Sequence, residues 1–274
     1  MEYIGVTGGK GGVGKSTFCV LLAKRLSKDK KVFLVDSDVG CANDHLLLGV
    51  KLKNRVRVVE NSYPVIDDEK CKRCGLCVEK CRYKALYMVG GGSPKVFAEM
   101  CASCGLCWNI CPYKAISKEK RVVGEIYEQK INDNLVLVSG VSLGVVEELA
   151  PIVRRLKEYV RERVKGVSDG VVVIDSAAGS HCGVIRALWG VDFAYVVTEP
   201  TSLGEHDLEV ILRLNKKIGI LSKVVINRCD LGDSSGIEKI VKNEKVEIVE
   251  RLKFNKGILG LYNSGRLLEV DEKV

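Results

Sequence analysis

The hydrophobic pattern of the chain alternates between short apolar runs and longer stretches with helical spacing. The apolar runs, rich in β-branched residues, lie at 3–6, 32–35, 171–174, 195–197 and 224–226, and a further predicted strand at 246–249 contains one glutamate. Apolar residues three and four positions apart recur at 18–26, 145–165 and 204–214, which predicts amphipathic helices. Wholly apolar runs are typical of parallel strands that are covered on both faces. The alternation therefore predicts an α/β fold with a mostly parallel sheet.

The loop between the first predicted strand and helix carries the clearest chemical signal. Residues 7–17 read Thr-Gly-Gly-Lys-Gly-Gly-Val-Gly-Lys-Ser-Thr and fit the phosphate-binding spacing G-x-x-x-x-G-K-[ST]. Glycines let successive backbone N–H groups turn inward around a phosphate, and the following helix adds its positive end. We expect Lys15 to reach the β- and γ-phosphates and Ser16 to ligate Mg²⁺. The expected nucleotide contacts in this loop are Gly9, Lys10, Gly11, Gly12, Val13, Gly14, Lys15, Ser16 and Thr17.

A second lysine, Lys10, lies inside this loop. The arrangement resembles the deviant phosphate-binding loop, K-G-G-x-G-K-[ST], of the MinD/ParA/nitrogenase-iron-protein group of ATPases. The resemblance implies a doubly wound ATPase in which the extra lysine crosses to the nucleotide of a second subunit, in a homodimer or a heterodimer with a paralogue. A cation delivered to the transferring phosphoryl group stabilises its charge as an arginine finger does. The alternative is a solvated loop lysine.

Carboxylates follow two of the predicted strands. Asp36 and Asp38 come after the second apolar run, and Asp175 ends the third. Ligands of open α/β sheets bind at the carboxyl ends of strands, so Asp175 is expected to contact Mg²⁺ through water. The resemblance further implies that Asp38 orients or activates the attacking water, that Asp36 supports the Mg²⁺ shell, and that the Gly179 amide senses the γ-phosphate. Asp36 and Asp38 would otherwise be capping residues of a strand-to-loop turn.

Two positions depend on the resemblance more heavily. Asn227 follows the strand at 224–226, where MinD-like ATPases place an asparagine against adenine. The same segment also resembles the N-K-x-D guanine reader of GTPases, with Arg228 in the lysine position, so ATP is favoured by the deviant loop while GTP stays open. Cys182 lies where the nitrogenase iron protein has a cluster cysteine, but without a partner cysteine we expect a small buried thiol or a switch contact.

The composition changes between 66 and 117, where a cysteine-rich segment occurs twice at a shift of thirty residues. Both copies have the spacing C-x₂-C-x₂-C-x₃-C of a two-cluster bacterial-type ferredoxin, in which the fourth cysteine of each run ligates the other cluster. The expected quartets are Cys71, Cys74, Cys77 and Cys111 for one [4Fe–4S] cluster, and Cys101, Cys104, Cys107 and Cys81 for the second. Pro112 follows the second run, whereas Arg82 replaces this proline after the first.

Zinc is the competing metal, because paired C-x₂-C units also occur in zinc ribbons. A zinc site has no use for a third cysteine at regular spacing. The flanks at 55–60 and 122–126 alternate as half-buried strands do. We therefore expect an α+β ferredoxin domain at 66–117, inserted between two parts of a P-loop ATPase domain, 1–65 and 118–274.

Composition and charge bear on whether the chain is a membrane, nucleic-acid-binding or secreted protein. The formal charge of +8 lies in short clusters, and no apolar run approaches the length of a membrane span. We find no clear element for nucleic-acid or membrane binding, and no basic leader followed by an apolar segment, so we expect a cytoplasmic protein. Disulfides are rare in that compartment, which directs attention to metal binding for the twelve cysteines.

Three functions fit these observations. The first is an ATP-gated dimer that couples nucleotide turnover to electron transfer toward a client redox protein or metalloprotein. The second is an iron–sulfur carrier or metallocentre maturation ATPase. The third is a MinD-type positioning ATPase whose clusters serve only the structure.

Overall fold

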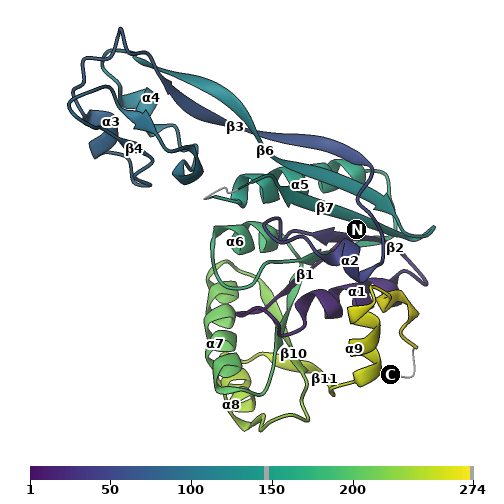
Figure 1. Ribbon diagram of the computed structural model, residues 1–274. Helices are drawn as coiled ribbons and strands as arrows, with labels where there is room; N and C mark the ends of the chain where they lie inside the picture. The colour runs from purple at the N-terminus through teal and green to yellow at the C-terminus, as the bar shows by residue number, and fades with distance from the viewer. Residues whose placement is uncertain (145–147, 272–274) are drawn as a thin grey trace.

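The computed structural model describes residues 1–144 and 148–271. Its main sheet has nine strands among these residues, and Figure 1 shows helices on both of its faces. The spatial order is β11 (Glu247–Leu252), β10 (Leu221–Asn227), β9 (Phe193–Thr198), β1 (Glu2–Thr7), β8 (Gly170–Asp175), β2 (Lys31–Asp36), β7 (Leu135–Ser142), β6 (Ile116–Lys130) and β3 (Arg55–Ile66). Each strand from β11 to β7 is parallel to its neighbour. Strand β6 is antiparallel to β7, and β3 is antiparallel to β6.

The central strands are buried on both faces, as their unbroken apolar runs predict. Phe33 and Val35 of β2 point into one core cluster, and Val32 and Leu34 of the same strand point into the other. The first cluster is covered by α5 (Ala150–Arg163) and α6 (Cys182–Leu188), and the second by α1 (Lys15–Leu26) with the 3₁₀ turn η2 (Leu267–Glu269). This alternation confirms the doubly wound, mostly parallel α/β fold.

The remaining helices complete the two layers. Helices α7 (Ser202–Lys217) and α8 (Ser235–Glu244) pack against β9 and β10, and α9 (Lys256–Asn263) contacts η2 near α1. The short helix α2 (Asp44–Leu47) lies beside α1. Of the helix expected at 145–165, residues 145–147 lie outside the described part of the chain. In the ranges 1–144 and 148–271, no helix has both the length and the apolarity needed to cross a membrane.

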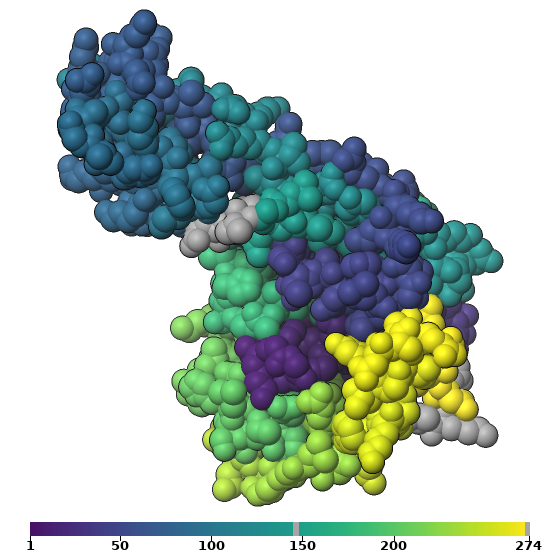
Figure 2. Space-filling view, in the orientation of Figure 1, coloured from purple at the N-terminus to yellow at the C-terminus, as the bar shows by residue number. Residues whose placement is uncertain are grey.

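A two-stranded ribbon extends from the edge of the sheet. Strand β6 pairs with β7 only over residues 124–130, so among the described residues 60–66 of β3 and 116–122 of β6 pair only with each other. Seven residues per strand, at about 3.4 Å each, give an arm of roughly 24 Å. Figure 1 shows this arm leading away from the sheet, and Figure 2 shows its tip standing apart from the main body.

Residues 67–115 form a small lobe at the tip of the ribbon. It contains α3 (Leu76–Glu79), β4 (Leu86–Tyr87), β5 (Lys95–Val96), the 3₁₀ turn η1 (Ala98–Met100) and α4 (Leu106–Ile110). The two cysteine segments adopt the same backbone course. Gly75 and Gly105 precede their helices with φ of 74° and 82°, and Lys84 and Lys114 follow with φ of 53° and 49°. The sequence repeat is therefore a structural repeat as well.

Candidate functional site

The glycine-rich loop joins β1 to α1 at the carboxyl edge of the sheet. Gly12 and Gly14 have positive φ of 83° and 99°, which a side chain would oppose. A Cβ on Gly14 would also lie 2.4 Å from Nδ2 of Asn227. Helix α1 begins at Lys15 with no side-chain cap, so its first N–H groups stay available to an anion. The loop thus has the geometry that a bound phosphate requires.

Buried carboxylates gather beside this loop. Asp36 and Asp175 end neighbouring strands, β2 and β8, and are directly paired in register. The backbone N–H of Asp44, at the start of α2, donates a hydrogen bond to Oδ2 of Asp36 at 3.1 Å. One oxygen of Asp36, one of Asp175 and both of Asp44 are buried and have no hydrogen-bond partner within the described chain. Such oxygens are costly to bury without a partner.

The pKa values of the buried carboxyl groups are raised because these groups lie away from solvent and close together. Burial raises the pKa of Asp175 to about 6, although a hydrogen bond with Ser16 and the charge of Lys15 act to lower it. Burial and the charge of Asp175 also raise the pKa of Asp36 well above its ordinary value. Burial lowers the pKa of Lys15, while Asp175 opposes that shift. Oxygen ligands are those that Mg²⁺ prefers, and the ion would relieve the repulsion between the carboxylates.

Asp44 belongs to this group although sequence analysis did not select it. Its side chain is fully buried, and burial followed by the charges of Asp36 and Asp175 raises its pKa. The only available signal was an acidic residue at the start of the helical turn that follows Asp38. Nothing local in the sequence indicates that this turn folds back under Asp36.

Asp38 and the start of α6 face each other across the site. Burial raises the pKa of Asp38, and the charges of Lys15 and then His181 lower it, so Asp38 faces both the phosphate loop and the start of α6. The N–H of Gly179 donates to the carbonyl of Gly8 at 3.1 Å. Cys182 is exposed, which corrects the expectation of a buried thiol, because it begins α6 on a solvent-facing turn.

Lys10 and the candidate base-binding loop are linked through one acidic residue. Nζ of Lys10 lies 2.6 Å from Oε1 of Glu199, which follows β9. The other carboxylate oxygen of Glu199 accepts from Arg228 at 2.9 Å. Beside Arg228, Nδ2 of Asn227 donates to the carbonyl of Val13 at 2.8 Å. Asn227 therefore touches the phosphate loop directly, and its expected contact with a base stays a prediction.

The eight cysteines of the repeat line two hollows in the small lobe. One hollow is lined by Cys71, Cys74, Cys77 and Cys111, and the other by Cys77, Cys81, Cys101, Cys104 and Cys107. Each hollow thus contains one of the quartets expected from the sequence, with Cys77 bordering both. None of the eight is in a disulfide within the part of the chain described.

The electrostatics of the hollows disfavour free thiolates. Burial, with smaller contributions from the neighbouring Cys101 and Cys104, raises the pKa of Cys107 to about 11. Burial also raises the pKa of Cys77, with smaller contributions from Cys111 and Cys71. Across residues 1–144 and 148–271, no three His, Cys, Asp or Glu side chains are gathered closely enough to hold a single metal ion.

Comparison with known proteins places the chain in a family. Residues 4–268 match the family model described as the CobQ/CobB/MinD/ParA nucleotide binding domain. The chain is 33% identical over 254 residues to protein MJ0579 of Methanocaldococcus jannaschii, and the aligned region covers 92% of this chain and 88% of that protein. It is 26% identical over 282 residues to the septum site-determining protein MinD of Bacillus subtilis, covering 99% and 83%.

Solved structures agree on the fold. MinD from Pyrococcus horikoshii, complexed with Mg-ADP, superposes with a TM-score of 0.57 at 20% identity, covering 96% of this chain and 86% of that one. A ParA family ATPase from Chlorobium tepidum gives a TM-score of 0.61 at 16% identity, covering 100% and 94%. The chain therefore belongs to the CobQ/CobB/MinD/ParA nucleotide-binding family and is a P-loop ATPase of the MinD/ParA type.

Proposed function

We propose that this ATPase is a nucleotide-dependent switch that dimerises on Mg-ATP and holds two [4Fe–4S] clusters in its small lobe. The unpartnered buried oxygens of Asp36, Asp44 and Asp175 beside Lys15 carry the nucleotide part of the proposal. Ser16, Asp36 and Asp175 would hold Mg²⁺, with Asp44 buried beside these two carboxylates. The P-loop lysine and the first amides of α1 would hold the phosphates.

Dimerisation rests on the position of Lys10. Its side chain is 26% exposed and sits on an open loop, paired with Glu199 rather than with any group of the phosphate site. In the proposed dimer Lys10 crosses to the γ-phosphate of the partner nucleotide. Its charge would then stabilise the transferring phosphoryl group, and Asp38 would orient the attacking water.

Matched lysine variants test this part. Lys15→Ala is expected to lose nucleotide binding altogether. Lys10→Ala should keep nucleotide affinity within about threefold, lose ATP-dependent dimerisation in sedimentation, and lower the ATPase rate by roughly a hundredfold or more. A monomeric wild type at saturating Mg-ATP, or an unchanged ATPase rate in Lys10→Ala, would refute the crossing role.

The two hollows support the cluster part of the proposal. Each contains a complete cysteine quartet, so residues 66–117 fit an inserted ferredoxin domain. A cubane binds one cysteine at each of four iron corners, so it needs a complete quartet rather than ligands gathered around one ion. It would also compensate the thiolate charge that burial disfavours at Cys107. Anaerobic purification should yield about eight iron atoms per chain and no zinc. Colourless protein loaded with zinc would overturn the cluster part of the proposal.

We propose further that the clusters transfer electrons to a partner redox protein or metalloprotein. Bound [4Fe–4S] clusters supply one-electron redox chemistry, with a potential set by charge, hydrogen bonds and solvent exposure. The lobe offers both exposure and distance from the main body, since it stands at the end of the ribbon. The test is the reduction potential measured with and without Mg-ATP, together with ATP-dependent binding of a partner.

A second candidate is a MinD-type positioning ATPase whose clusters are structural. The similarity to MinD of Bacillus subtilis along 99% of this chain favours it, as does the length of the ribbon that separates the lobe from the nucleotide site. Here the potentials would be the same in both nucleotide states, and cluster reduction would leave the ATPase rate unchanged. A nucleotide-dependent potential would reject this candidate.

A further inference from the structure

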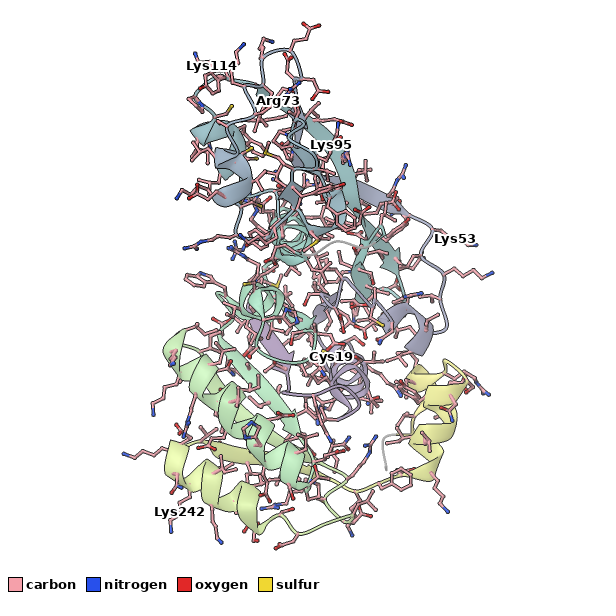
Figure 3. The ribbon with its side chains drawn as sticks, turned by 60° about the vertical axis from the view of Figure 1, so that its left-hand side comes forward. Cys19, Lys53, Arg73, Lys95, Lys114 and Lys242 are labelled. Carbon is pink, nitrogen blue, oxygen red and sulfur yellow. The ribbon has the colours of Figure 1, made fainter. Side chains whose placement is uncertain are left out.

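Exposed cations lie in the segments that line the hollow containing the first cysteine quartet. Lys72 lines this hollow, and Arg73, Lys95 and Lys114 each directly follow a lining residue. All four are exposed, and none makes an ion pair with another described residue, whereas Lys70 next to them is paired with Asp67. Figure 3 shows Arg73, Lys95 and Lys114 on the small lobe. We call Lys72, Arg73, Lys95 and Lys114 the basic rim.

The lobe has too few acidic residues to neutralise the rim. Residues 67–115 contain eight Lys or Arg and five Asp or Glu, which leaves a net charge of +3. Two of those acids already pair with cations outside the rim, Asp67 with Lys70 and Glu79 with Lys80. Asp68, Glu69 and Glu99 are the remaining acids. The rim therefore presents uncompensated positive charge to solvent.

Exposed aromatic side chains lie among these cations. Tyr113 lines the same hollow, immediately before Lys114, and is 46% exposed. Tyr87 is 44% exposed and pairs directly with Lys95 across the β4–β5 ladder. Arginine and exposed tyrosine are enriched at the cores of protein interfaces, where aromatic rings bury area at low entropic cost. Each of these exposed tyrosines thus lies next to one cation of the rim.

We propose that the basic rim, with Tyr87 and Tyr113, docks an acidic surface of a partner protein over the first cysteine hollow. This partner is the redox protein or metalloprotein of the proposed function, so the proposal rests on that function. Complementary charge would steer the encounter and fix the orientation, and the tyrosines would supply the buried contact. A protein fits better than a nucleic acid, because a net charge of +3 over 49 residues is weak for a phosphate-binding stripe.

The test uses the full chain, with its iron content and ATP-dependent dimer measured on the same samples. The probe is a flavodoxin of strongly negative net charge, with binding followed by calorimetry at low and at moderate salt. The variant is Arg73→Glu/Lys95→Glu/Lys114→Glu. The matched control, Lys30→Glu/Lys53→Glu/Lys242→Glu, changes the net charge equally at exposed cations outside the lobe. Lys53 and Lys242 are marked in Figure 3 on other parts of the molecule.

We expect the rim variant to weaken flavodoxin binding at least tenfold and the control to change it less than twofold. Wild-type affinity should fall as salt rises. Equal losses in both variants, or no binding by the wild type at low salt, would overturn the proposal. A single-stranded oligonucleotide that binds the rim more tightly than the probe would overturn it in favour of nucleic acid. Normal iron content and dimerisation in any of these cases would leave the proposed function standing.

Discussion

Lys10 of the phosphate loop and Glu199 after β9 form an ion pair, with Nζ 2.6 Å from Oε1. The Glu199 side chain is only 12% exposed, and its second oxygen holds Arg228 at 2.9 Å. One carboxylate therefore fixes the lysine expected to act on the partner nucleotide and the arginine beside Asn227. In the proposed dimer, Lys10 has to leave Glu199 before it can cross, so the pair opposes assembly.

The first prediction concerns this opposition. Glu199→Gln keeps the shape of the side chain and removes the charge that holds Lys10. We expect ATP-dependent dimerisation to strengthen roughly fivefold, which corresponds to about 1 kcal/mol, a typical scale for one partly buried pair. Sedimentation velocity over a series of protein concentrations, at saturating Mg-ATP, measures the change in the dimer dissociation constant. Both proteins also carry Asp38→Ala, which is expected to prevent hydrolysis of the ATP during the experiment.

A control for this variant lies on α7. Glu209→Gln breaks an exposed pair with Arg213 and should leave dimerisation within twofold of the wild type. Nucleotide affinity is expected to stay within about threefold in both variants. If Glu199→Gln dimerises no better than Glu209→Gln, the ion pair does not restrain Lys10.

The second prediction addresses Asp44. In the absence of a cation its carboxylate faces Asp36 and Asp175 without a hydrogen-bond donor. Because burial and the charges of Asp36 and Asp175 raise the pKa of Asp44, its ionised form is costly in the folded chain. Asp44→Asn removes that cost, so the nucleotide-free protein should gain about 1–3 kcal/mol in its free energy of unfolding. The same change should weaken Mg-ATP binding at least tenfold. Urea unfolding and Mg²⁺-dependent nucleotide titration measure the two effects, and a destabilised nucleotide-free protein would contradict the argument.

The contrast between Asp44 and Asp175 shows how far the sequence reaches. Asp175 was predictable because it directly ends an apolar run, and the order of parallel strands brings it to the phosphate loop. Asp44 and Glu199 were not, because their roles depend on contacts that no local pattern encodes. Which cysteines line the same hollow was predictable from their spacing, whereas the ribbon that carries them was not, since alternation at 55–60 gives no strand length. The exposure of Cys182 was not predictable either, because it depends on how its turn lies on the fold, and only the expectation of a buried thiol is wrong.

The third prediction tests the close approach at Gly14. A Cβ there would lie 2.4 Å from Nδ2 of Asn227, and φ is 99°. Gly14→Ala should displace Asn227, strain the loop by about 1–3 kcal/mol and weaken nucleotide binding by tenfold or more. Gly260→Ala on α9 provides the control, because a Cβ at Gly260 meets no described atom within 4 Å and its φ is not in the left-handed region. Equal nucleotide affinities for the two variants, measured by calorimetry, would contradict the argument.

A buried lysine joins α5 to the end of α6. Nζ of Lys157 donates to the carbonyls of Arg186, Ala187 and Trp189 at 3.2, 2.6 and 2.6 Å. Burial, and then the charges of Arg161 and Arg186, lower its pKa to about 7. The three carbonyls belong to the last turn of α6 and the residue after it, so this side chain caps the carboxyl end of α6.

The fourth prediction is a pH dependence of stability that comes from Lys157. Its pKa is about 7 in the folded chain and 10.5 in the unfolded chain, so between these values the unfolded state binds more protons. Stability contributed by this group therefore rises with pH across that window, with a slope approaching 1.4 kcal/mol per pH unit, and is constant below it. Lys157→Met should lose this slope and, at pH 9, unfold more readily, because the neutral amine still offers two N–H groups to these carbonyls and methionine offers none. Urea unfolding of the wild type, Lys157→Met and the exposed Lys165→Met at pH 7, 8 and 9 gives the three slopes. Lys165→Met should follow the wild type, and parallel lines for all three proteins would show that Lys157 keeps its proton throughout.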